Sequence, residues 1–293
     1  MIIIPEIFAR DTITREGEAG RQWLAALPDL AAALCHQWQL VIDGAPMHGY
    51  LGIVIPVQRN GEDCVLKVSW QDAATTHEAV ALAAWNGQGA VRLLAAEPAL
   101  GAMLLERLEH QRDLRTVPVD EALLVAGHLL RRLAIPAVVD LPTIATLAAE
   151  IARQMPVRWA AYGRPLPQRL LDHACELALH HSATATTLLV NYDLHDENIL
   201  AGRREPWLAV DPKVVIGDPE FGIAQLLMNR LDEIETTGGL ARHFPRLIAA
   251  AELDEGLARD WTLVRCVDYW LWGLSVGLTE DPKRCAAIVE WLS

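Results

Sequence analysis

The chain has 293 residues, of which 52% are hydrophobic and 22% charged, and its formal net charge is −13. This balance excludes disordered, collagen-like and low-complexity classes, and no apolar run approaches the roughly 18–20 residues that a membrane span needs. The acidity argues against nucleic acid as a partner, because phosphate backbones favour basic surfaces, and it suits a cationic ligand. With no basic secretory start at the N-terminus, we expect a cytoplasmic protein that contacts neither membrane nor nucleic acid.

The first half of the chain is predicted to form a helix followed by a small antiparallel sheet. Asn60-Gly61 is a strong signal for a hairpin turn, because both central positions of that turn need a positive φ. The expected elements, in chain order, are a helix over 21–37 broken at Pro28, strands over 39–43, 50–58 and 63–69, a helix over 73–86, and strands over 90–95 and 102–105.

After residue 106 the pattern becomes mostly helical, with two short apolar segments and a third run embedded in it. The expected helices cover 119–133, 142–154, 167–181, 219–232, 244–252, 257–276 and 282–292, and the apolar segments cover 187–191, 198–201 and 207–210. The predicted fold class is therefore α+β, with an N-terminal lobe over 1–108 and a helical lobe over 109–293. A cleft between two such lobes is the default place for a ligand.

One polar loop carries the clearest chemical signal. Asp193 and Asn198 lie in D-L-H-D-E-N between two apolar runs, and Asp211 ends the next run. If these runs pair as strands, the three side chains come close to one point. Their oxygens suit Mg²⁺, which binds few carboxylates and bridges substrate phosphates, and a carboxylate that does not bind metal can accept a hydroxyl proton. An isolated D-x-x-x-x-N is common in ordinary loops, but the flanking strands and the second aspartate favour a functional site.

A second signal is a lysine within an apolar strand. Only three of the 25 basic residues are lysines, and one of them, Lys67, lies in V-L-K-V. Alternation places Lys67 on the same strand face as Val65. Glu78 follows near the start of the next helix, where it could pair with the lysine and hold the amine for phosphate oxygens. The alternative is an edge-strand lysine that prevents aggregation.

The order of these features resembles that of the parts of the protein-kinase-like fold: V-L-K-V comes first, then Glu78, then the D-x-x-x-x-N loop and last Asp211. The loop D-L-H-D-E-N-I-L and the segment L-A-V-D-P-K-V-V-I-G-D-P-E-F-G at 208–222 are similar to motifs of the aminoglycoside phosphotransferases. The sequence W-N-G-Q-G-A-V-R-L-L at 85–94 resembles their streptomycin 6-phosphotransferase branch, which includes hydroxyurea phosphotransferases.

The resemblance implies two lobes with a nucleotide cleft between them, and transfer of the γ-phosphate of ATP to a hydroxyl of a small cationic acceptor, an aminoglycoside such as streptomycin. The resemblance implies that Asp193 is the catalytic base or hydroxyl-orienting group and that Asn198 and Asp211 are Mg²⁺ ligands. It implies that Lys67 contacts the α- and β-phosphates, with Glu78 as its partner. The Glu106 carbonyl and the Leu108 amide would be the hinge contacts to adenine.

Two departures from the family pattern leave alternatives open. The family's His-Gly is replaced by Asn191-Tyr192, where Asn191 could supply part of the histidine's hydrogen bonding, and no G-x-G-x-x-G precedes the hairpin. The alternatives are a kinase of hydroxyurea or another small metabolite, and a nucleotide-binding pseudokinase without turnover.

For the acceptor, the resemblance implies contacts in the C-terminal helices. Asp268 and Trp272 are four residues apart on the predicted helix 257–276, so they share one face. A carboxylate beside an indole suits an ammonium or guanidinium group. Glu220 and Glu197 are further candidates. The alternatives are that the tryptophans belong to the core, that Asp268 pairs with Arg265, and that Glu220 complements a helix dipole.

Overall fold

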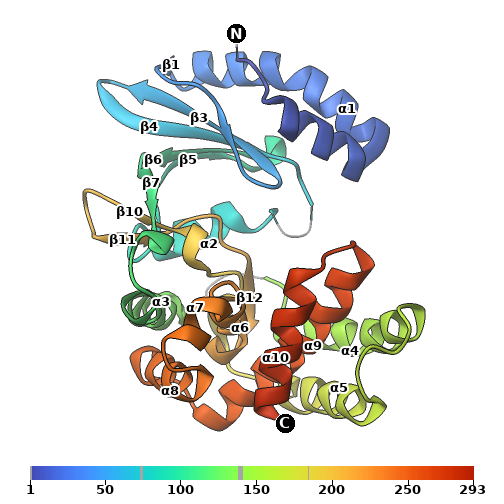
Figure 1. The fold of residues 1–293 in the computed structure, drawn as a ribbon. Coiled ribbons are helices and arrows are strands. Elements are labelled where there is room, and N and C mark those ends of the chain that lie inside the picture. Colours follow the sequence, from blue (N-terminus) through green and yellow to red (C-terminus); the bar gives the residue numbers. More distant parts are fainter. Residues whose placement is uncertain (1, 73–74, 138–140, 184) are drawn as a thin grey trace. The chain divides into compact units, whose positions relative to one another are not determined.

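The computed structural model describes residues 2–72, 75–137, 141–183 and 185–293. The chain divides into two compact units, Met1–Leu108 and Glu109–Ser293 (Figure 1). The first unit contains α1 (Glu6–Gln37), β1 (Val41–Ile42), β2 (Met47–His48), β3 (Gly52–Arg59), β4 (Glu62–Ser69), α2 (Glu78–Trp85), β5 (Leu93–Glu97) and β6 (Ala102–Glu106).

The first unit is built on an antiparallel sheet ordered β1-β3-β4-β6-β5, with β2 also paired to β3. Ile55 of β3 lies opposite Leu66 of β4, and both are fully buried in one apolar cluster with Leu27 of α1. Val54 and Lys67, the next pair in register, must therefore point to the other face of the sheet. The α1 helix thus covers one face and leaves the lysine on the opposite one.

Two features of this unit test the sequence predictions directly. Asn60 and Gly61 have φ values of 54° and 81°, which confirms the predicted hairpin turn between β3 and β4. The first helix, in contrast, begins at Glu6 and continues through Pro28, with non-helical angles at Gly17. The prediction missed its first half because acidic and polar residues obscure the apolar face, although Phe8 and Thr12 are buried there.

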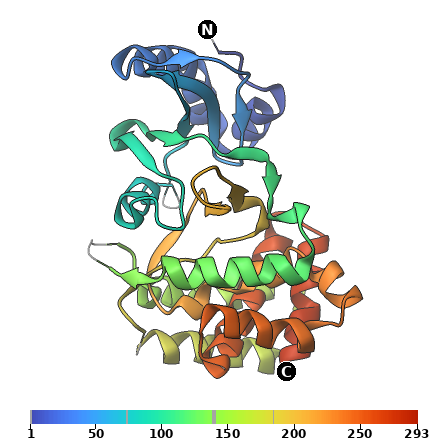
Figure 2. The ribbon, with the colours of Figure 1, turned by 90° about the vertical axis from the view of Figure 1, so that its left-hand side faces the viewer.

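The second unit consists of helices around two three-stranded sheets. Its elements are β7 (Glu109–Asp113), α3 (Val119–Leu133), β8 (Ile135–Pro136), α4 (Ile144–Ala161), α5 (Gln168–Ser182), β9 (Leu188–Asn191), β10 (Ile199–Ala201), β11 (Trp207–Ala209), β12 (Val214–Gly217), α6 (Ala224–Met228), α7 (Leu231–Thr236), α8 (Leu240–Ala251), α9 (Glu255–Ser275) and α10 (Glu280–Leu292). The α3 helix packs on α8, and α9 packs on α10, α5 and α4 (Figure 2).

The two small sheets hold the loop that the sequence singled out. The strand orders are β11-β10-β7 and β12-β9-β8. Residues 192–198 connect β9, in the second of these sheets, to β10 in the first. The loop is therefore anchored at both ends by strands with partners on each side.

The predicted helix over 219–232 is wrong as a single element. The structure has a 3₁₀ turn at Pro219–Gly222, followed by the short helices α6 and α7. A Cβ atom on Gly222 would lie 2.7 Å from the main-chain oxygen of Asn191, so this segment approaches β9 too closely for a side chain. Among the helices of the described residues, none combines the length and the apolar character of a membrane span.

Candidate active site

In the first unit, Lys67 and Glu78 form a buried ion pair. The Lys67 Nζ lies 2.7 Å from both carboxylate oxygens of Glu78, and the two residues are 8% and 1% exposed. β4 supplies the lysine and the first residue of α2 supplies the glutamate. Removing one partner of such a pair leaves a buried charge and typically costs about 3–5 kcal/mol. The pairing predicted from sequence is confirmed, and it joins α2 to the sheet.

The predicted hinge residues lie where β6 ends. Glu106 is the last residue of β6, its amide donates to the Arg92 carbonyl at 3.1 Å, and its side chain accepts from the Arg92 amide at 2.8 Å. Between it and Leu108, the Arg107 guanidinium donates to the Asp43 carboxylate at 2.6 Å and to the Cys64 carbonyl at 3.0 Å. Sequence reasoning missed Arg107, whose side chain ties the end of β6 to β4 and to Asp43.

In the second unit, Asp193 lies at the start of the loop after β9 and is held from several directions. Its Oδ2 is 2.8 Å from the Lys213 Nζ, and its Oδ1 accepts a long bond of 3.4 Å from the Gln225 side chain. Its amide donates to the Asn191 Oδ1 at 3.1 Å. Asn191, which stands where the family has histidine, thus does brace the loop.

The structure also brings Asn198 and Asp211 to the same end of one hairpin. β10 and β11 pair directly after Asn198, and the Val210 amide donates to the Asn198 carbonyl at 2.8 Å. The Asn198 side-chain amide donates to the Asp193 carbonyl at 3.4 Å. Asp211 adopts a left-handed φ of 50°, a conformation that is uncommon outside glycine and often marks functional loops.

Lys213, the last residue of the D-P-K segment, lies beside Asp193. Burial disfavours its ammonium, but the Asp193 carboxylate outweighs burial and holds the pKa of Lys213 above its usual value. The ion pair leaves Asp193 neutralised on one side while its other oxygen faces Gln225. The D-P-K segment was the only feature of the sequence that pointed to Lys213. No motif pointed to Gln225.

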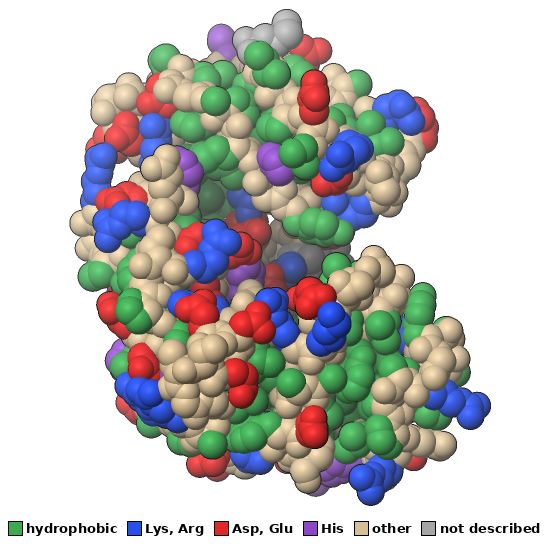
Figure 3. Space-filling view, in the orientation of Figure 1, with side chains coloured by type: hydrophobic (Ala, Val, Ile, Leu, Met, Phe, Trp, Pro, Cys, Tyr) green, Lys and Arg blue, Asp and Glu red, His purple; other side chains and the backbone are tan. Residues whose placement is uncertain are grey.

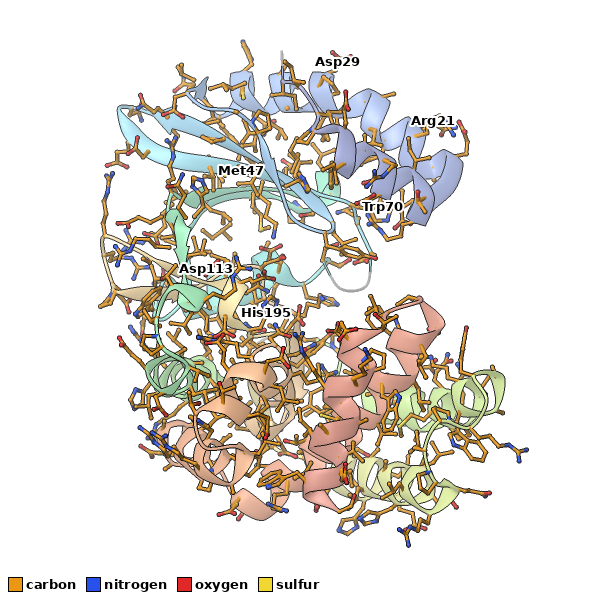
Figure 4. The ribbon with its side chains drawn as sticks, viewed as in Figure 1. Arg21, Asp29, Met47, Trp70, Asp113 and His195 are labelled. Carbon is orange, nitrogen blue, oxygen red and sulfur yellow. The ribbon has the colours of Figure 1, made fainter. Side chains whose placement is uncertain are left out.

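The loop has a second buried anchor at Asp196. The residue is 2% exposed, and burial raises the pKa of Asp196 to about 6 despite Arg230, whose Nη1 lies 3.9 Å from its Oδ1. The neighbouring His195, labelled in Figure 4, is partly buried, and burial lowers its pKa while the Asp193 charge opposes that effect. His195 therefore belongs to the electrostatic surroundings of Asp193.

The four acceptor candidates occupy different surroundings. Asp268 accepts from the Arg158 guanidinium at 3.0 Å, and Trp272, also on α9, stacks on Tyr269 with ring centroids 5.0 Å apart. Burial raises the pKa of Asp268, with Arg265 and Arg158 opposing that effect. The alternative pairing of Asp268 with Arg265 is therefore replaced by a bridge between α4 and α9.

The two glutamates, Glu220 and Glu197, already contact other residues of the second unit. Glu220 is 7% exposed, and its Oε1 accepts from the Asp254 amide at 3.1 Å, immediately before α9. Glu197 is exposed and pairs with Arg115. Arg115 also pairs with Asp113, labelled in Figure 4, at the end of β7. Each of the two glutamates thus already joins separate elements of the second unit.

Comparison with known proteins decides the family. The family model described as aminoglycoside/hydroxyurea antibiotic resistance kinase matches residues 37–277. The chain belongs to this family. It is 35% identical to the streptomycin 6-kinase of Streptomyces griseus over 299 residues, which covers 100% of this chain and 97% of the relative. It is 34% identical to the hydroxyurea phosphotransferase of Kitasatospora aureofaciens over 297 residues, covering 100% and 86%.

Solved structures agree on the fold. The aminoglycoside phosphotransferase APH(4)-Ia, in a ternary complex with ADP and hygromycin B, matches with a TM-score of 0.59 at 17% identity, covering 88% of this chain and 97% of that one. The fold is accordingly protein-kinase-like, with an antiparallel N-terminal sheet and a helical C-terminal region, as predicted. As a member of this kinase family the chain is a small-molecule kinase.

Proposed function

We propose that this kinase transfers the γ-phosphate of ATP to a hydroxyl of a small cationic acceptor, an aminoglycoside such as streptomycin. The observation that carries the proposal is the Asp193 carboxylate, held by Lys213 at 2.8 Å next to Asn198. The 35% identity to a streptomycin 6-kinase over the full chain supports the acceptor class. Because ATP is the phosphate donor, we keep the cytoplasmic location as a prediction.

In the proposed reaction, Asp193 orients the acceptor hydroxyl and takes its proton as the oxygen bonds to the γ-phosphorus. The bond between that phosphorus and the β,γ-bridging oxygen breaks, and ADP leaves with its electrons. Such transition states are stabilised mainly by positioning and by cations around the phosphoryl oxygens. Lys213, paired with Asp193, holds a positive charge beside the reacting oxygen.

The donor set also fits a divalent metal. Mg²⁺ is usually bound by one or two carboxylates together with substrate phosphates, and not by a dedicated protein cage. Asp211 and Asn198, which lie at the open end of the β10–β11 hairpin, carry one carboxylate and one amide oxygen. These two residues would hold Mg²⁺, which when bound neutralises phosphate charge. Lys67, fixed by Glu78, would contact the α- and β-phosphates, and the Glu106 carbonyl and Leu108 amide would contact adenine.

For the acceptor we retain Asp268 and Trp272 ahead of Glu220 and Glu197. Asp268 has a second oxygen besides the one that accepts from Arg158. Trp272 and its neighbour Tyr269 provide aromatic faces for a guanidinium or ammonium group, contacts worth about 0.5–2 kcal/mol.

A second candidate acceptor is hydroxyurea, because the hydroxyurea phosphotransferase is as similar to this chain as the streptomycin kinase is. The pseudokinase alternative loses its main argument, since the Asn191 side chain bonds to the Asp193 amide where the family histidine is missing.

The test is a phosphotransfer assay with labelled ATP and Mg²⁺ over a panel of aminoglycosides and hydroxyurea. We expect Asp193→Ala to lower kcat by on the order of 10²–10⁴ and to leave ATP affinity, measured by calorimetry, nearly unchanged. Asp193→Asn keeps the shape and should be almost as inactive. Near-normal turnover in both variants would remove Asp193 from the mechanism, and ATP binding without transfer to any compound would favour the pseudokinase.

A further inference from the structure

The peptide that precedes Asp193 is held at both of its polar ends. Its N–H, on Asp193, donates to the Asn191 side chain at 3.1 Å. Its carbonyl, on Tyr192, accepts from the Arg265 Nη2 at 3.4 Å. A peptide is planar, so fixing both groups fixes the plane and with it the Asp193 Cα, the point from which the side chain leaves the backbone.

Arg265 reaches this carbonyl from α9, 73 residues further along the chain. Its guanidinium carbon lies 5.3 Å from the ring centroid of Tyr192 and 4.7 Å from that of Phe221. The two rings are 5.9 Å apart at an interplanar angle of 66°. Both distances to the guanidinium are within the range of cation–π contacts, which strengthen when the cation is removed from water.

The far side of this clamp is rigid. Phe221 is fully buried and packs edge-on against Trp261 of α9, with ring centroids 5.1 Å apart. The Trp261 indole donates to the Asp218 carboxylate at 3.3 Å. Among the described residues, the Nε of Arg265 is buried without a hydrogen-bond partner. Leaving such a donor unsatisfied is costly, so packing alone does not account for an arginine here.

We propose that Arg265, held between the rings of Tyr192 and Phe221, is a positioning residue that orients Asp193 for phosphoryl transfer. Tyr192, in the position where the family motif has glycine, supplies the ring that makes the clamp possible. Arg265 does not touch the reacting atoms and acts through the Tyr192 carbonyl. The inference rests on the role proposed above for Asp193.

The test compares Arg265→Met with Arg259→Met. Arg259 is a matched control, because it lies on the same helix and its guanidinium stacks 4.7 Å from the Trp291 ring. Each variant loses two cation–π contacts, so both should lower the melting temperature. Only Arg265→Met should lower kcat, on the order of 10²-fold if the carboxylate shifts by about 1 Å, with the KM for ATP unchanged. A kcat equal to that of the Arg259→Met control would overturn the proposal.

Variants of Tyr192 provide a second readout that a purely structural role would not move. Tyr192→Phe keeps the ring and the backbone, so its kcat should lie well above that of Tyr192→Gly. Tyr192→Gly removes one wall of the clamp and should lower kcat, and adding Arg265→Met to it should cost less than Arg265→Met costs alone. Additive losses would contradict a shared clamp. If Asp193→Ala abolishes turnover while these variants behave like the control, the proposed function stands and only the clamp fails.

Discussion

At the scale of single residues, the second unit contains carboxylates whose burial sets them apart from surface groups. Glu220 is the clearest case, because it is nearly inaccessible and its charge faces a backbone amide and not an arginine. Burial raises the pKa of Glu220 above its usual value, and the amides of Glu220 and Asp254 oppose this only in part. Ionising it therefore costs the folded state free energy.

This gives a prediction for Glu220→Gln. A carboxyl whose pKa is raised by folding makes the folded state bind its proton more tightly than the unfolded chain does, so its effect on stability becomes unfavourable as pH rises above its usual value. Glutamine keeps the oxygen that accepts from the Asp254 amide. We expect the variant to be at least as stable as the parent at pH 7–8 and to lose that advantage below about pH 4, measured by urea unfolding.

The same variant separates structure from acceptor binding. Its KM for the acceptor should rise if Glu220 contacts a cationic substrate, and should stay at the parent value if the residue only anchors the start of α9. A large loss of stability at pH 7–8 would contradict the assignment of an energetically unfavourable charge.

At the scale of elements, α3 and α8 approach unusually closely. A Cβ built on Gly127 of α3 would lie 2.9 Å from the Ala250 Cβ and 3.2 Å from the Leu247 carbonyl of α8. Backbone atoms cannot move aside as a flexible side chain can. The glycine is therefore the residue that sets the spacing of this helix pair.

We expect Gly127→Ala to destabilise the protein even though alanine is the better helix former. Overpacking typically costs about 1–3 kcal/mol, against a propensity gain of at most about 1 kcal/mol. Gly256→Ala in α9 is the control, because the nearest atom to its Cβ is the Asp254 carboxylate oxygen at 3.3 Å. Thermal and urea unfolding of both variants give the measurement, and equal stability of the two would show that α3 and α8 can separate freely.

The elements also show how far sequence reasoning reached. The helix predicted over 119–133 has the observed bounds of α3, and both strands flanking the Asp193 loop were found, because periodicity and motifs are local signals. The strands β7, β8 and β12 were missed, since they are short and their pairing depends on distant partners. For the same reason no local pattern pointed to Gln225 or to the stacking of Arg265 on Tyr192.

At the scale of the whole molecule, the chain has a formal net charge of −13. On the face shown in Figure 3, acidic and basic side chains alternate and form no large patch of one sign. The net charge is therefore expected to act on ligands as a long-range, salt-sensitive field, distinct from the short-range contacts proposed for Asp268 and Lys67.

This leads to opposite salt responses for the two substrates. A net negative field attracts a cationic aminoglycoside and opposes ATP. Raising the ionic strength from about 0.01 M to about 1 M shortens the Debye length from about 30 Å to about 3 Å and removes that field. With the other substrate saturating, we expect kcat/KM for the aminoglycoside to fall by on the order of 10-fold, while kcat/KM for ATP holds steady or rises. Hydroxyurea, which is neutral, provides the control on the acceptor side. A parallel fall in kcat/KM for all three compounds would mean that salt acts on the enzyme itself. If kcat/KM for the aminoglycoside responds to salt as little as that for hydroxyurea, the acidity of the chain plays no part in acceptor capture.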